Sequence, residues 1–439
     1  MKIKKVKWKS HPILGDLELD FTNSDTGEPF DNILFAGENG TGKTTILETI
    51  NRFLNGYTFD GFEYIEYVTE GKNLKAVPST NPDEVKRGFY VMVEENGVIT
   101  KMNTGKENSS SSTSNPTVDN NPLNIRYSGS VLSKARADFQ TKKITSTTTQ
   151  ELDSFKSSLD DSDDFTSLKQ LIIDIENQDN SEYRKINKTR DDNPISEKDF
   201  CPTSKIYRFR NAFNSFFDKI QYNGTDDING EKQILFIKND INISIDRLST
   251  GEKQIVYRGA YLLRNSNNLS GATIMIDEPE LSMHPKWQEK ILQYYKNLFT
   301  ERDTGIQKAQ LFFASHSDRL LKKALSDRDS NKIIALIDNN GKVEPKYINT
   351  TNTLSIITYA ETNYLVFDII SIDYHIELYS CLQDITHNEF SVRDCDNYIE
   401  GHDLYDSTKH YKDYSFTDKN GNIRTYNTLP VVHLSDSSF

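Results

Sequence analysis

The sequence contains few cysteines and no long apolar run, and each shortage excludes a class of protein. Its three cysteines, Cys201, Cys381 and Cys395, lie far apart and form no CxxC pair, so neither a disulfide framework nor a cysteine zinc site is supported. No stretch approaches the roughly 18 consecutive apolar residues that a transmembrane helix needs. The first six residues alternate charged and apolar side chains, unlike a signal peptide. We therefore expect a cytoplasmic protein with no membrane partner.

Positive charge is also scarce. The chain of 439 residues has 52 lysines and arginines against 65 aspartates and glutamates, a net charge of −13. Proteins that grip duplex DNA without sequence preference are usually basic, so the balance argues against obligate DNA binding. A local basic groove stays open as an alternative, because binding depends on where the charges lie. The length suits one large α/β domain with an appendage, or two to three modest domains.

Apolar spacing near the N-terminus predicts two strands, then a strand–loop–helix unit. Residues 6–9 and 17–21 alternate apolar and polar side chains, as half-buried strands do. The continuous apolar run 33–36 is typical of a buried parallel strand. It leads into a glycine-rich turn, and residues 44–54 then follow helical spacing. A strand that ends in such a turn, with a helix directly after it, is the context that a phosphate-binding loop requires.

The remainder of the chain alternates predicted helices and strands. Helices are expected at 165–186, 204–222, 251–265 and 286–300. Strands are expected at 125–128, 272–276, 311–315 and 333–338, with a hairpin from 234–237 and 241–245 around Asn239-Asp240. This alternation is typical of a parallel sheet with helices on its faces. The absence of a sustained heptad pattern between 55 and 245 argues against a long coiled coil.

Two polar segments interrupt this pattern. Residues 105–122 are rich in serine, threonine, asparagine and proline and predict a surface loop within an insertion. The acidic run 160–164 predicts a solvated helix entry. The predicted domains are therefore a discontinuous core at 1–100 and 205–350, a polar and partly disordered insertion with helices at 101–204, and a helical C-terminal region with a polar tail at 351–439.

The glycine-rich turn matches the P-loop pattern G-x4-G-K-[ST] in full at Gly37–Thr44. Glycines let backbone N–H groups converge on phosphate oxygens, and the following helix directs its positive end at the same anion. Lys43 is expected to reach the β- and γ-phosphates of ATP, and the Thr44 hydroxyl to bind Mg²⁺. The predicted nucleotide contacts are Gly37, Asn39, Gly40, Thr41, Gly42, Lys43, Thr44 and Thr45. A chance glycine turn is the alternative, and the flanking strand and helix disfavour it.

A second apolar strand, at Ala272–Ile276, ends in the adjacent acids Asp277 and Glu278. This is the pattern of a Walker B strand. Asp277 is expected to hold Mg²⁺ through water, and Glu278 to polarise the attacking water. The alternative is an ordinary acidic exit from a strand, which is common by itself and much less so in a chain that also carries a P-loop.

The segment Leu248–Gln254, LSTGEKQ, resembles the signature of ABC-type ATPase heads, in the form seen in Rad50-, RecF- and OLD-like proteins. The resemblance implies an ABC-head P-loop fold in which Ser249, Gly251 and Glu252 meet the nucleotide held by a second copy, so that hydrolysis requires a homo-oligomer. A plain helix cap is the alternative, because Ser249 followed three residues later by Glu252 is also a capping box.

Three further elements complete the resemblance. Leu281–Pro285 looks like the D-loop at the dimer interface of this family, where His284 is more in keeping with a structural than a catalytic role. His316 ends an apolar strand, as does the switch histidine that holds the catalytic glutamate and the water in register. The Q-loop is not assigned, because no glutamine ends the strand expected at 125–128. Gln140 is a candidate for its glutamine and is not chosen.

Residues 356–382 resemble the segment that follows the ATPase core in bacterial anti-phage defence ATPases, most closely the ATPase subunit of Septu-type systems, some of them retron-associated. The resemblance implies an oligomer that gates a separate nuclease of the HNH type. The alternative is two amphipathic helices that pack on the head, with His375 and Glu377 on their surface. A RecF- or Rad50-like repair ATPase that acts directly on DNA is a second hypothesis, and a transporter motor a third and weaker one.

The chain itself offers no nuclease pattern. The strand expected at 333–338 ends in one aspartate, without the acidic pair of a Toprim nuclease. His387, His402 and His410 are scattered in a polar tail and lack HNH spacing. The resemblance to the defence ATPases implies an arginine–asparagine element after Thr428-Leu429-Pro430, and this sequence lacks it there, so the tail is expected to be either divergent or truncated. The predicted enzyme is therefore an ATPase that uses ATP and Mg²⁺ and has no nuclease site of its own.

Overall fold

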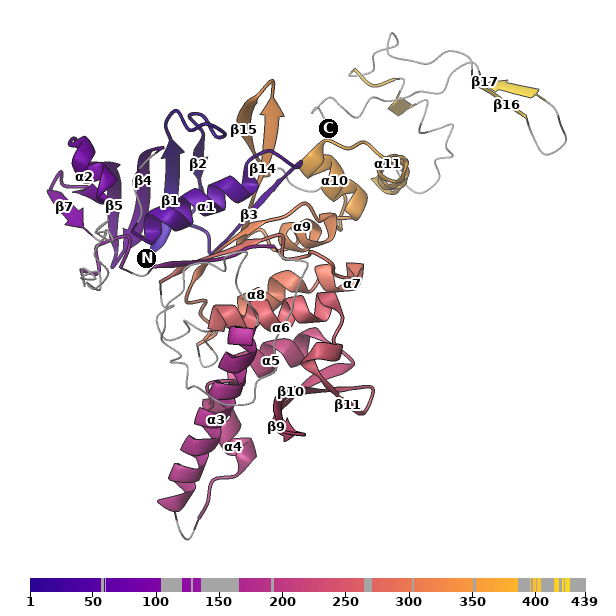
Figure 1. Cartoon of the computed structure of the whole chain (residues 1–439). Coiled ribbons are helices and arrows are strands. Elements are labelled where there is room, and N and C mark those ends of the chain that lie inside the picture. Colours follow the sequence, from indigo (N-terminus) through magenta and orange to yellow (C-terminus); the bar gives the residue numbers. More distant parts are fainter. Residues whose placement is uncertain are drawn as a thin grey trace. The chain divides into compact units, whose positions relative to one another are not determined.

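The chain forms two units, Met1–Tyr347 and Ile348–Phe439, in the computed structural model (Figure 1). The structure describes residues 1–56, 59, 61–103, 121–127, 129–135, 166–190, 193–263, 271–301, 304–349 and 353–385, with short stretches between 395 and 426. The polar run 105–120 and the acidic run 160–164 lie outside the described residues, as does Gln140.

The first unit is built on a six-stranded sheet of order β15-β14-β3-β13-β12-β8. Its strands are β3 (Asn32–Gly37), β8 (Ser130–Ser133), β12 (Thr273–Asp277), β13 (Gln310–Ala314), β14 (Asn331–Asn339) and β15 (Lys342–Tyr347). Every neighbouring pair is parallel except β14 and β15. The carboxyl ends of β3, β12 and β13 therefore meet at one edge. The predicted α/β class, with a mixed and mostly parallel sheet flanked by helices, is confirmed.

One face of this sheet is covered by helix α1 (Lys43–Leu54) and by an antiparallel sheet of order β2-β1-β4-β5-β6-β7. The added elements are β1 (Lys2–Trp8), β2 (Glu18–Asp20), β4 (Phe62–Thr69), β5 (Lys72–Pro78), α2 (Pro82–Lys86), β6 (Phe89–Glu94) and β7 (Ile99–Asn103). Buried residues of both sheets and α1 form one hydrophobic core. The buried Gln310 side chain joins the layers, because it accepts a hydrogen bond from the Ile3 amide at 2.7 Å and donates one to the Ile3 carbonyl at 3.0 Å.

The opposite face is covered by helices α6 (Thr250–Leu263), α8 (Ile291–Phe299) and α9 (Asp318–Leu325). Strand β13 illustrates the division, because successive side chains of a strand point to opposite faces. The Phe312 ring packs 5.2 Å from that of Phe21 in the core on the α1 side. The Phe313 ring lies 6.0 Å from that of Tyr295 on α8. The sheet is thus buried on both faces, as its continuous apolar strands predict.

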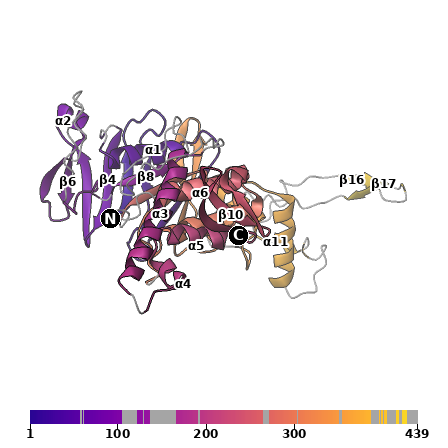
Figure 2. The ribbon, with the colours of Figure 1, turned by 60° about the horizontal axis from the view of Figure 1, so that its bottom comes forward.

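A helical extension and a small sheet lie beyond α6, and Figure 2 shows them from below. They comprise α3 (Thr166–Lys188), α4 (Glu197–Phe200), α5 (Tyr207–Phe216), β9 (Ile220–Ile228), β10 (Glu231–Lys238) and β11 (Ile241–Ser244), with 3₁₀ turns at Cys201–Thr203 and Ile245–Arg247. The Lys169 ammonium of α3 is 1% exposed and lies 3.1 Å from the carboxylate of Asp246. This ion pair, between a buried lysine and a partly exposed aspartate, anchors α3 beside the loop that leads into α6.

Two predicted elements are wrong in extent. The helix expected at 204–222 ends at Phe216, because the apolar residues after it pair as β9 with β10. The helix expected at 286–300 is broken into α7 (Pro285–Gln288) and α8, because the Lys290 amide bonds the Trp287 carbonyl at 3.0 Å, three residues back, and tightens the chain into a turn.

One predicted strand is wrong in place. Residues 124–127 form a turn, in which the Asn124 side chain accepts a hydrogen bond from the Arg126 amide at 2.9 Å. The Arg126 guanidinium is buried 4.3 Å from the centre of the Phe53 ring. The strand begins later, as β8, and pairs in parallel with β12. It comes from the segment expected to be an insertion, yet it completes the central sheet.

The second unit contains the two helices that the C-terminal pattern predicts, α10 (Tyr359–Phe367) and α11 (Ile372–Ile385), and a hairpin of β16 (Tyr414–Thr417) and β17 (Ile423–Tyr426). The rings of Tyr364 and Tyr374 stack 5.0 Å apart and join the helices. The Thr358 hydroxyl also donates a hydrogen bond to the Glu377 carboxylate at 2.5 Å. None of the helices in the described residues is long and apolar enough to cross a membrane.

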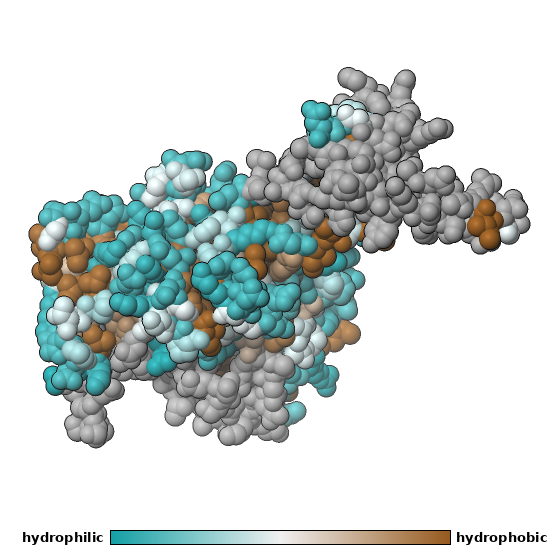
Figure 3. All heavy atoms as spheres, turned by 90° about the horizontal axis from the view of Figure 1, so that it is seen from above, coloured by the Kyte–Doolittle hydropathy of each residue, from teal (hydrophilic) through white to brown (hydrophobic). Residues whose placement is uncertain are grey.

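The face seen from above in Figure 3 is mostly hydrophilic over the first unit, and hydrophobic residues gather where β6 and β7 lie. Val98 and Ile99, at the start of β7, are 48% and 70% exposed. β7 is the edge strand of its sheet, and edge strands offer unpaired backbone groups. The P-loop motif lies in the other layer, at the carboxyl edge of the mostly parallel sheet that contains β3.

Candidate functional site

The turn between β3 and α1 has the backbone of a phosphate-binding loop. Gly37 adopts φ 141°, and a Cβ there would lie 2.6 Å from the Leu336 carbonyl oxygen, so only glycine fits. Gly42 adopts φ 86° and is the N-cap of α1, with no side-chain cap. The N–H groups of the first turn are therefore not satisfied by a capping side chain, and they point out of the loop where an anion is favoured.

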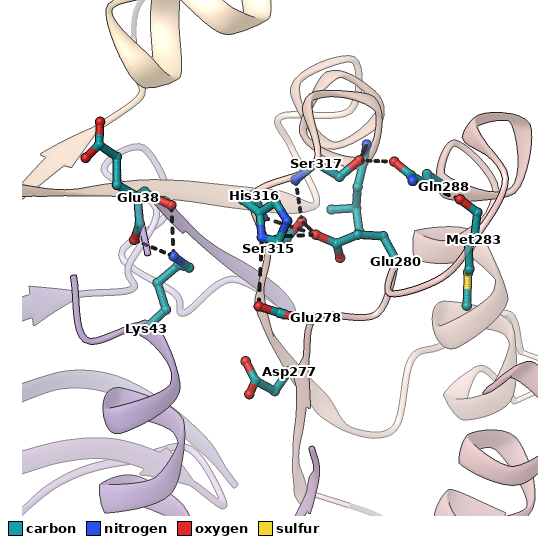
Figure 4. A network of polar contacts seen from close by, with 12 residues as sticks. Glu38, Lys43, Asp277, Glu278, Glu280, Met283, Gln288, Ser315, His316 and Ser317 are labelled. Carbon is teal, nitrogen blue, oxygen red and sulfur yellow. Dashed lines mark hydrogen bonds and ion pairs between the residues drawn. The ribbon is translucent and has the colours of Figure 1, made fainter. Parts of the chain in front are cut away.

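Lys43 lies at the centre of this loop. Its Nζ donates hydrogen bonds to the carbonyl oxygens of Gly37 and Glu38, both at 2.8 Å (Figure 4). The side chain is buried, and burial lowers the pKa of Lys43 because it disfavours the charged form, while the charges of Glu278 and Asp277 act in the opposite direction. The loop thus holds a partly desolvated ammonium group, which is a strong attractor for an anion.

Thr44 and Asp277 meet between the loop and β12. The Thr44 hydroxyl lies 3.1 Å from both carboxylate oxygens of Asp277. Burial, opposed by the Thr44 hydrogen bond and reinforced by the charge of Glu278, raises the pKa of Asp277 to about 6. A hydroxyl and a carboxylate at this spacing are the hard oxygen ligands that Mg²⁺ prefers together with phosphate oxygens. The residues present therefore fit a magnesium–nucleotide group.

Glu278 and His316 leave adjacent strand ends and face each other. The Nδ1 atom of His316 lies 3.9 Å from the Oε1 atom of Glu278. Glu278 adopts φ 43°, a left-handed conformation that is strained for a non-glycine residue and is typical of functional sites. Its amide is held by the Ala314 carbonyl at 2.8 Å. Both side chains are partly exposed, at 31% and 50%, so water can reach them.

The signature segment forms the capping box that the sequence allows. The Ser249 amide donates to the Glu252 carboxylate at 2.8 Å, and the Glu252 amide contacts the Ser249 hydroxyl at 3.4 Å. The Glu252 carboxylate is buried and also pairs with the Lys238 ammonium at 2.7 Å. A Cβ on Gly251 would lie 2.7 Å from the Ser282 carbonyl oxygen. Glu252 is therefore engaged within its own chain, while Ser249 is exposed.

The remaining predicted contacts are distributed around the loop. The Thr41 hydroxyl bonds the Glu38 carbonyl at 2.9 Å and closes the turn. Asn39 and Gly40 are exposed at its tip, and Thr45 lies half-buried in the first turn of α1. His284 caps α7, since its Nδ1 accepts a hydrogen bond from the Lys286 amide at 3.2 Å.

Two residues of the site escaped the sequence reasoning. Arg258, on α6, donates to the carbonyl oxygens of Asp277 and of Glu278, the second at 2.9 Å, and to that of Ser133 at 3.3 Å. Glu280 accepts from the Ser315 hydroxyl at 2.7 Å. The available signal was a charged residue inside an apolar helix for Arg258. For Glu280 it was a third acid within four residues of Asp277.

Comparison with known proteins identifies a family and a curated relative. The family model described as "AAA domain, putative AbiEii toxin, Type IV TA system" matches residues 33–322, well over half of the chain. A curated relative, the "Retron Vc95 probable ATPase" of Vibrio cholerae serotype O1 biovar El Tor, is 31% identical over 140 residues, which cover 29% of this chain and 26% of the relative. The matched part is thus about a quarter of that protein's length.

Two solved structures are also similar over most of their length. One is a crystal structure of an SMC head bound to the C-terminal winged-helix domain of ScpA, with 13% identity and a TM-score of 0.42 over 79% of this chain and 98% of that one. The other is the SMC head domain from Thermotoga maritima, with 12% identity and a TM-score of 0.36 over 80% of this chain and 100% of that one.

The family match covers the P-loop, the acidic strand end and His316 together. The chain belongs to this family of AAA-domain ATPases.

Proposed function

We propose that the chain binds and hydrolyses ATP with Mg²⁺ at the carboxyl edge of the central sheet. The observation that carries the proposal is the meeting of Thr44 and Asp277, at 3.1 Å, beside a loop whose lysine is held by two of its carbonyls. Neither motif alone fixes this arrangement, because the residues are far apart in the sequence. Their convergence puts oxygen ligands for a cation next to a cradle for phosphate.

Each residue then has a defined task. The ammonium of Lys43 exchanges its carbonyl partners for phosphate oxygens, and Thr44 and Asp277 hold the cation, which neutralises charge on the phosphates when it is bound. Glu278 accepts the proton of the attacking water. His316, 3.9 Å from Glu278, orients that carboxylate.

The proposal includes a second copy of the chain. Ser249 lies exposed at the start of α6, a helix of 14 residues, and among the described residues its hydroxyl makes only a long 3.4 Å contact, within the capping box. A helix start with an available hydroxyl favours an anion. Within its own chain Gly251 packs against Ser282. We therefore assign Ser249 to the nucleotide bound by a neighbouring copy, with Gly251, buried against Ser282, as the residue that lets the start of α6 lie this close to the loop Leu281–Pro285.

Turnover and nucleotide retention test the assignment. Lys43→Ala protein should fail to bind a fluorescent ATP analogue. Glu278→Gln protein should bind ATP and retain it, with turnover slowed ~100-fold or more, because the water loses its base. Glu289→Gln is the matched control, since its carboxylate pairs at 3.3 Å with Arg319 of helix α9. Wild-type turnover in the Glu278→Gln protein would overturn the assignment.

We also propose that the ATPase gates a separate nuclease in anti-phage defence. Support comes from the similarity to a retron ATPase and from the second unit. Ile372 and Ile376, one turn apart on α11, are 79% and 57% exposed, and the sequence from 348 to 392 contains no lysine or arginine. An apolar stripe in an acidic segment suits a basic, amphipathic segment of a partner.

Co-purification with the product of the neighbouring gene tests this role. The wild-type protein should form a stable complex whose nuclease activity responds to ATP. Ile372→Asp with Ile376→Asp should abolish the complex, whereas Ile423→Asp, at a site 75% exposed on β17, should not. A lone dimer stimulated by DNA ends would instead support the repair hypothesis and contradict this one.

A further inference from the structure

Glu280 is a buried acid that the roles proposed above leave unused. It follows β12 in the sequence Asp277-Glu278-Pro279-Glu280, and its side chain is 5% exposed. Its Oε1 atom accepts hydrogen bonds from the Ser315 hydroxyl at 2.7 Å and from the His316 amide at 3.1 Å (Figure 4). Its Oε2 atom is buried and has no hydrogen-bond partner among the described residues. Burying a carboxylate is costly, so its position calls for a reason.

That reason is the placement of His316. The imidazole Nδ1 lies 3.9 Å from the Oε1 atom of Glu280 and 3.9 Å from that of Glu278. The His316 side chain is half exposed, and within the described part of the chain its ring forms no ion pair shorter than these two. Its location is therefore determined mainly by its backbone, and the backbone amide is held by Glu280. Removing that acceptor frees the segment that carries the ring.

The same contacts connect His316 to the loop Leu281–Pro285. Within the β13 exit, the Ser317 amide bonds the Ser315 hydroxyl at 3.1 Å. The Ser317 hydroxyl then donates to the Gln288 side chain at 2.7 Å, and that side chain donates to the Met283 carbonyl at 3.1 Å. The β12 exit and the β13 exit are thus tied at two points, through Glu280 and through Gln288.

We propose that Glu280 is a positioning residue for ATP hydrolysis, which holds His316 against Glu278 and makes its position depend on the loop Leu281–Pro285. The inference rests on the proposed ATPase site and deepens it. Glu280 acts on hydrolysis through the Ser315 hydroxyl and the His316 amide. Because that loop carries Ser282, which packs against Gly251, a movement of the signature helix would reach His316 by this route.

The decisive measurement is a double-mutant cycle on kcat. Glu280→Ala should lower kcat ~30- to 100-fold and leave KM for ATP within ~3-fold, because positioning errors of about 1 Å cost this much while ground-state binding is unaffected. His316→Ala should lower kcat similarly. The double variant should be no slower than His316→Ala alone, because Glu280 acts through His316. Effects that multiply would overturn the inference.

Conservative variants separate reach from charge. Glu280→Gln keeps an oxygen acceptor for both hydrogen bonds and should recover most of the lost kcat, whereas Glu280→Asp is one methylene too short and should not. If Glu280→Ala fails to fold in thermal melts, Ser315→Ala removes one of the two bonds and should lower kcat less, in the same KM-independent way. An unchanged kcat in Ser315→Ala protein would contradict positioning by these bonds. So would a lower kcat in Glu280→Gln than in Glu280→Asp protein.

The outcome is distinguishable from failure of the ATPase proposal. If wild-type protein does not hydrolyse ATP, or Glu278→Gln turns over normally, the proposed function itself fails. If wild-type protein hydrolyses ATP and Glu278→Gln traps it, but Glu280→Ala keeps wild-type kcat, only the role of Glu280 fails. Glu289→Ala, at a carboxylate 45% exposed, is the control for removal of an acid near α7.

Discussion

Arg258 Nη1 lies 2.9 Å from the carbonyl oxygen of Glu278, which joins the helix of the signature segment to the strand end that carries both acids. The same guanidinium bonds the carbonyl oxygens of Asp277 and Ser133, so a single side chain spans α6, β12 and β8. Arg258 is 3% exposed. The planar fork of an arginine places its N–H donors on three separate nitrogens, so it reaches carbonyls of separate elements that a single ammonium nitrogen does not span.

Replacement of Arg258 by lysine should therefore destabilise the protein and slow hydrolysis. At least one buried carbonyl would lose its donor, at a cost of about 1–3 kcal/mol in the free energy of unfolding. Urea unfolding and kcat for ATP measure the two effects. Arg319→Lys, at an arginine 33% exposed in a surface ion pair, is the control and should change stability by ~0.5 kcal/mol or less. Equal stability of the two variants would contradict the bridging role.

Asp277 makes the stability of the nucleotide-free protein depend on pH. Its pKa is raised from 3.8 to about 6, mainly by burial, so the folded state binds a proton that the unfolded state releases. Stability should therefore fall as pH rises from about 4 to about 6. In Asp277→Asn protein this component should be absent, and the variant should be more stable than wild type at pH 7 by at most ~3 kcal/mol. Unfolding free energies at pH 4.5 and pH 7 check both statements.

Magnesium and ATP should reverse the effect of that substitution. When a cation neutralises the carboxylate, the ionised form of Asp277 is favoured. Wild-type protein should then gain thermal stability on addition of magnesium and ATP, by mass action, and Asp277→Asn protein should gain much less. The same gain in both proteins would show that Asp277 does not hold the cation.

The sequence predicts the local parts of this structure better than the contacts between them. The glycine spacing before Lys43 and the apolar run before Asp277 determine short backbone segments, and β3, α1 and β12 lie where these patterns predict. Partners of buried polar groups depend on how distant elements pack. Nothing near Gln310 in the sequence indicates that it bonds Ile3, and nothing near Arg258 names the strand ends it bridges.

The wrong strand at 125–128 has a related cause. Its apolar residues resemble a strand, but Asn124 forms a turn with its own side chain, and Arg126 is buried against Phe53 of α1. Hydrophobic alternation cannot distinguish a strand from a turn whose side chains are buried by a neighbouring helix. The antiparallel strands between 62 and 103 were likewise not predicted individually, because their pairing is set by neighbours in the sheet.

Glu252 should act on stability and on ATP hydrolysis through the helix cap at the start of α6. Its carboxylate already accepts the Ser249 amide and pairs with Lys238. Glu252→Ala should therefore lower the free energy of unfolding by about 1–2 kcal/mol, the range for loss of a cap, and raise KM for ATP in hydrolysis. Lys238→Met should share the stability loss in part, because it removes only the ion pair. Unfolding curves and Michaelis plots of both variants distinguish a cap from a direct contact with nucleotide. If Glu252 contacted the nucleotide directly, Lys238→Met should leave KM for ATP unchanged.

Mixing two inactive variants should restore activity if neighbouring copies share a site. Ser249→Arg protein should bind ATP normally but hydrolyse it poorly, because a large cation at the start of α6 blocks closure against the neighbouring copy. Lys43→Ala protein should not bind ATP. In a mixed pair, one of the two composite sites combines an intact Lys43 from one copy with an intact Ser249 from the other. Because half of randomly formed pairs are mixed, turnover should recover to about a quarter of the wild-type value at most.

The control for this mixture is a pair of variants that damage the same half of the site. In a mixture of Lys43→Ala and Asp277→Asn proteins, both defects lie on the nucleotide-binding side of the site. One site of a mixed pair then has a damaged phosphate loop and the other a damaged cation ligand, so the pair should stay inactive. Recovery with Ser249→Arg and none with Asp277→Asn would locate Ser249 across the interface. Because a monomer that completes its own site cannot be rescued by a second chain, absence of recovery in both mixtures would contradict a shared site.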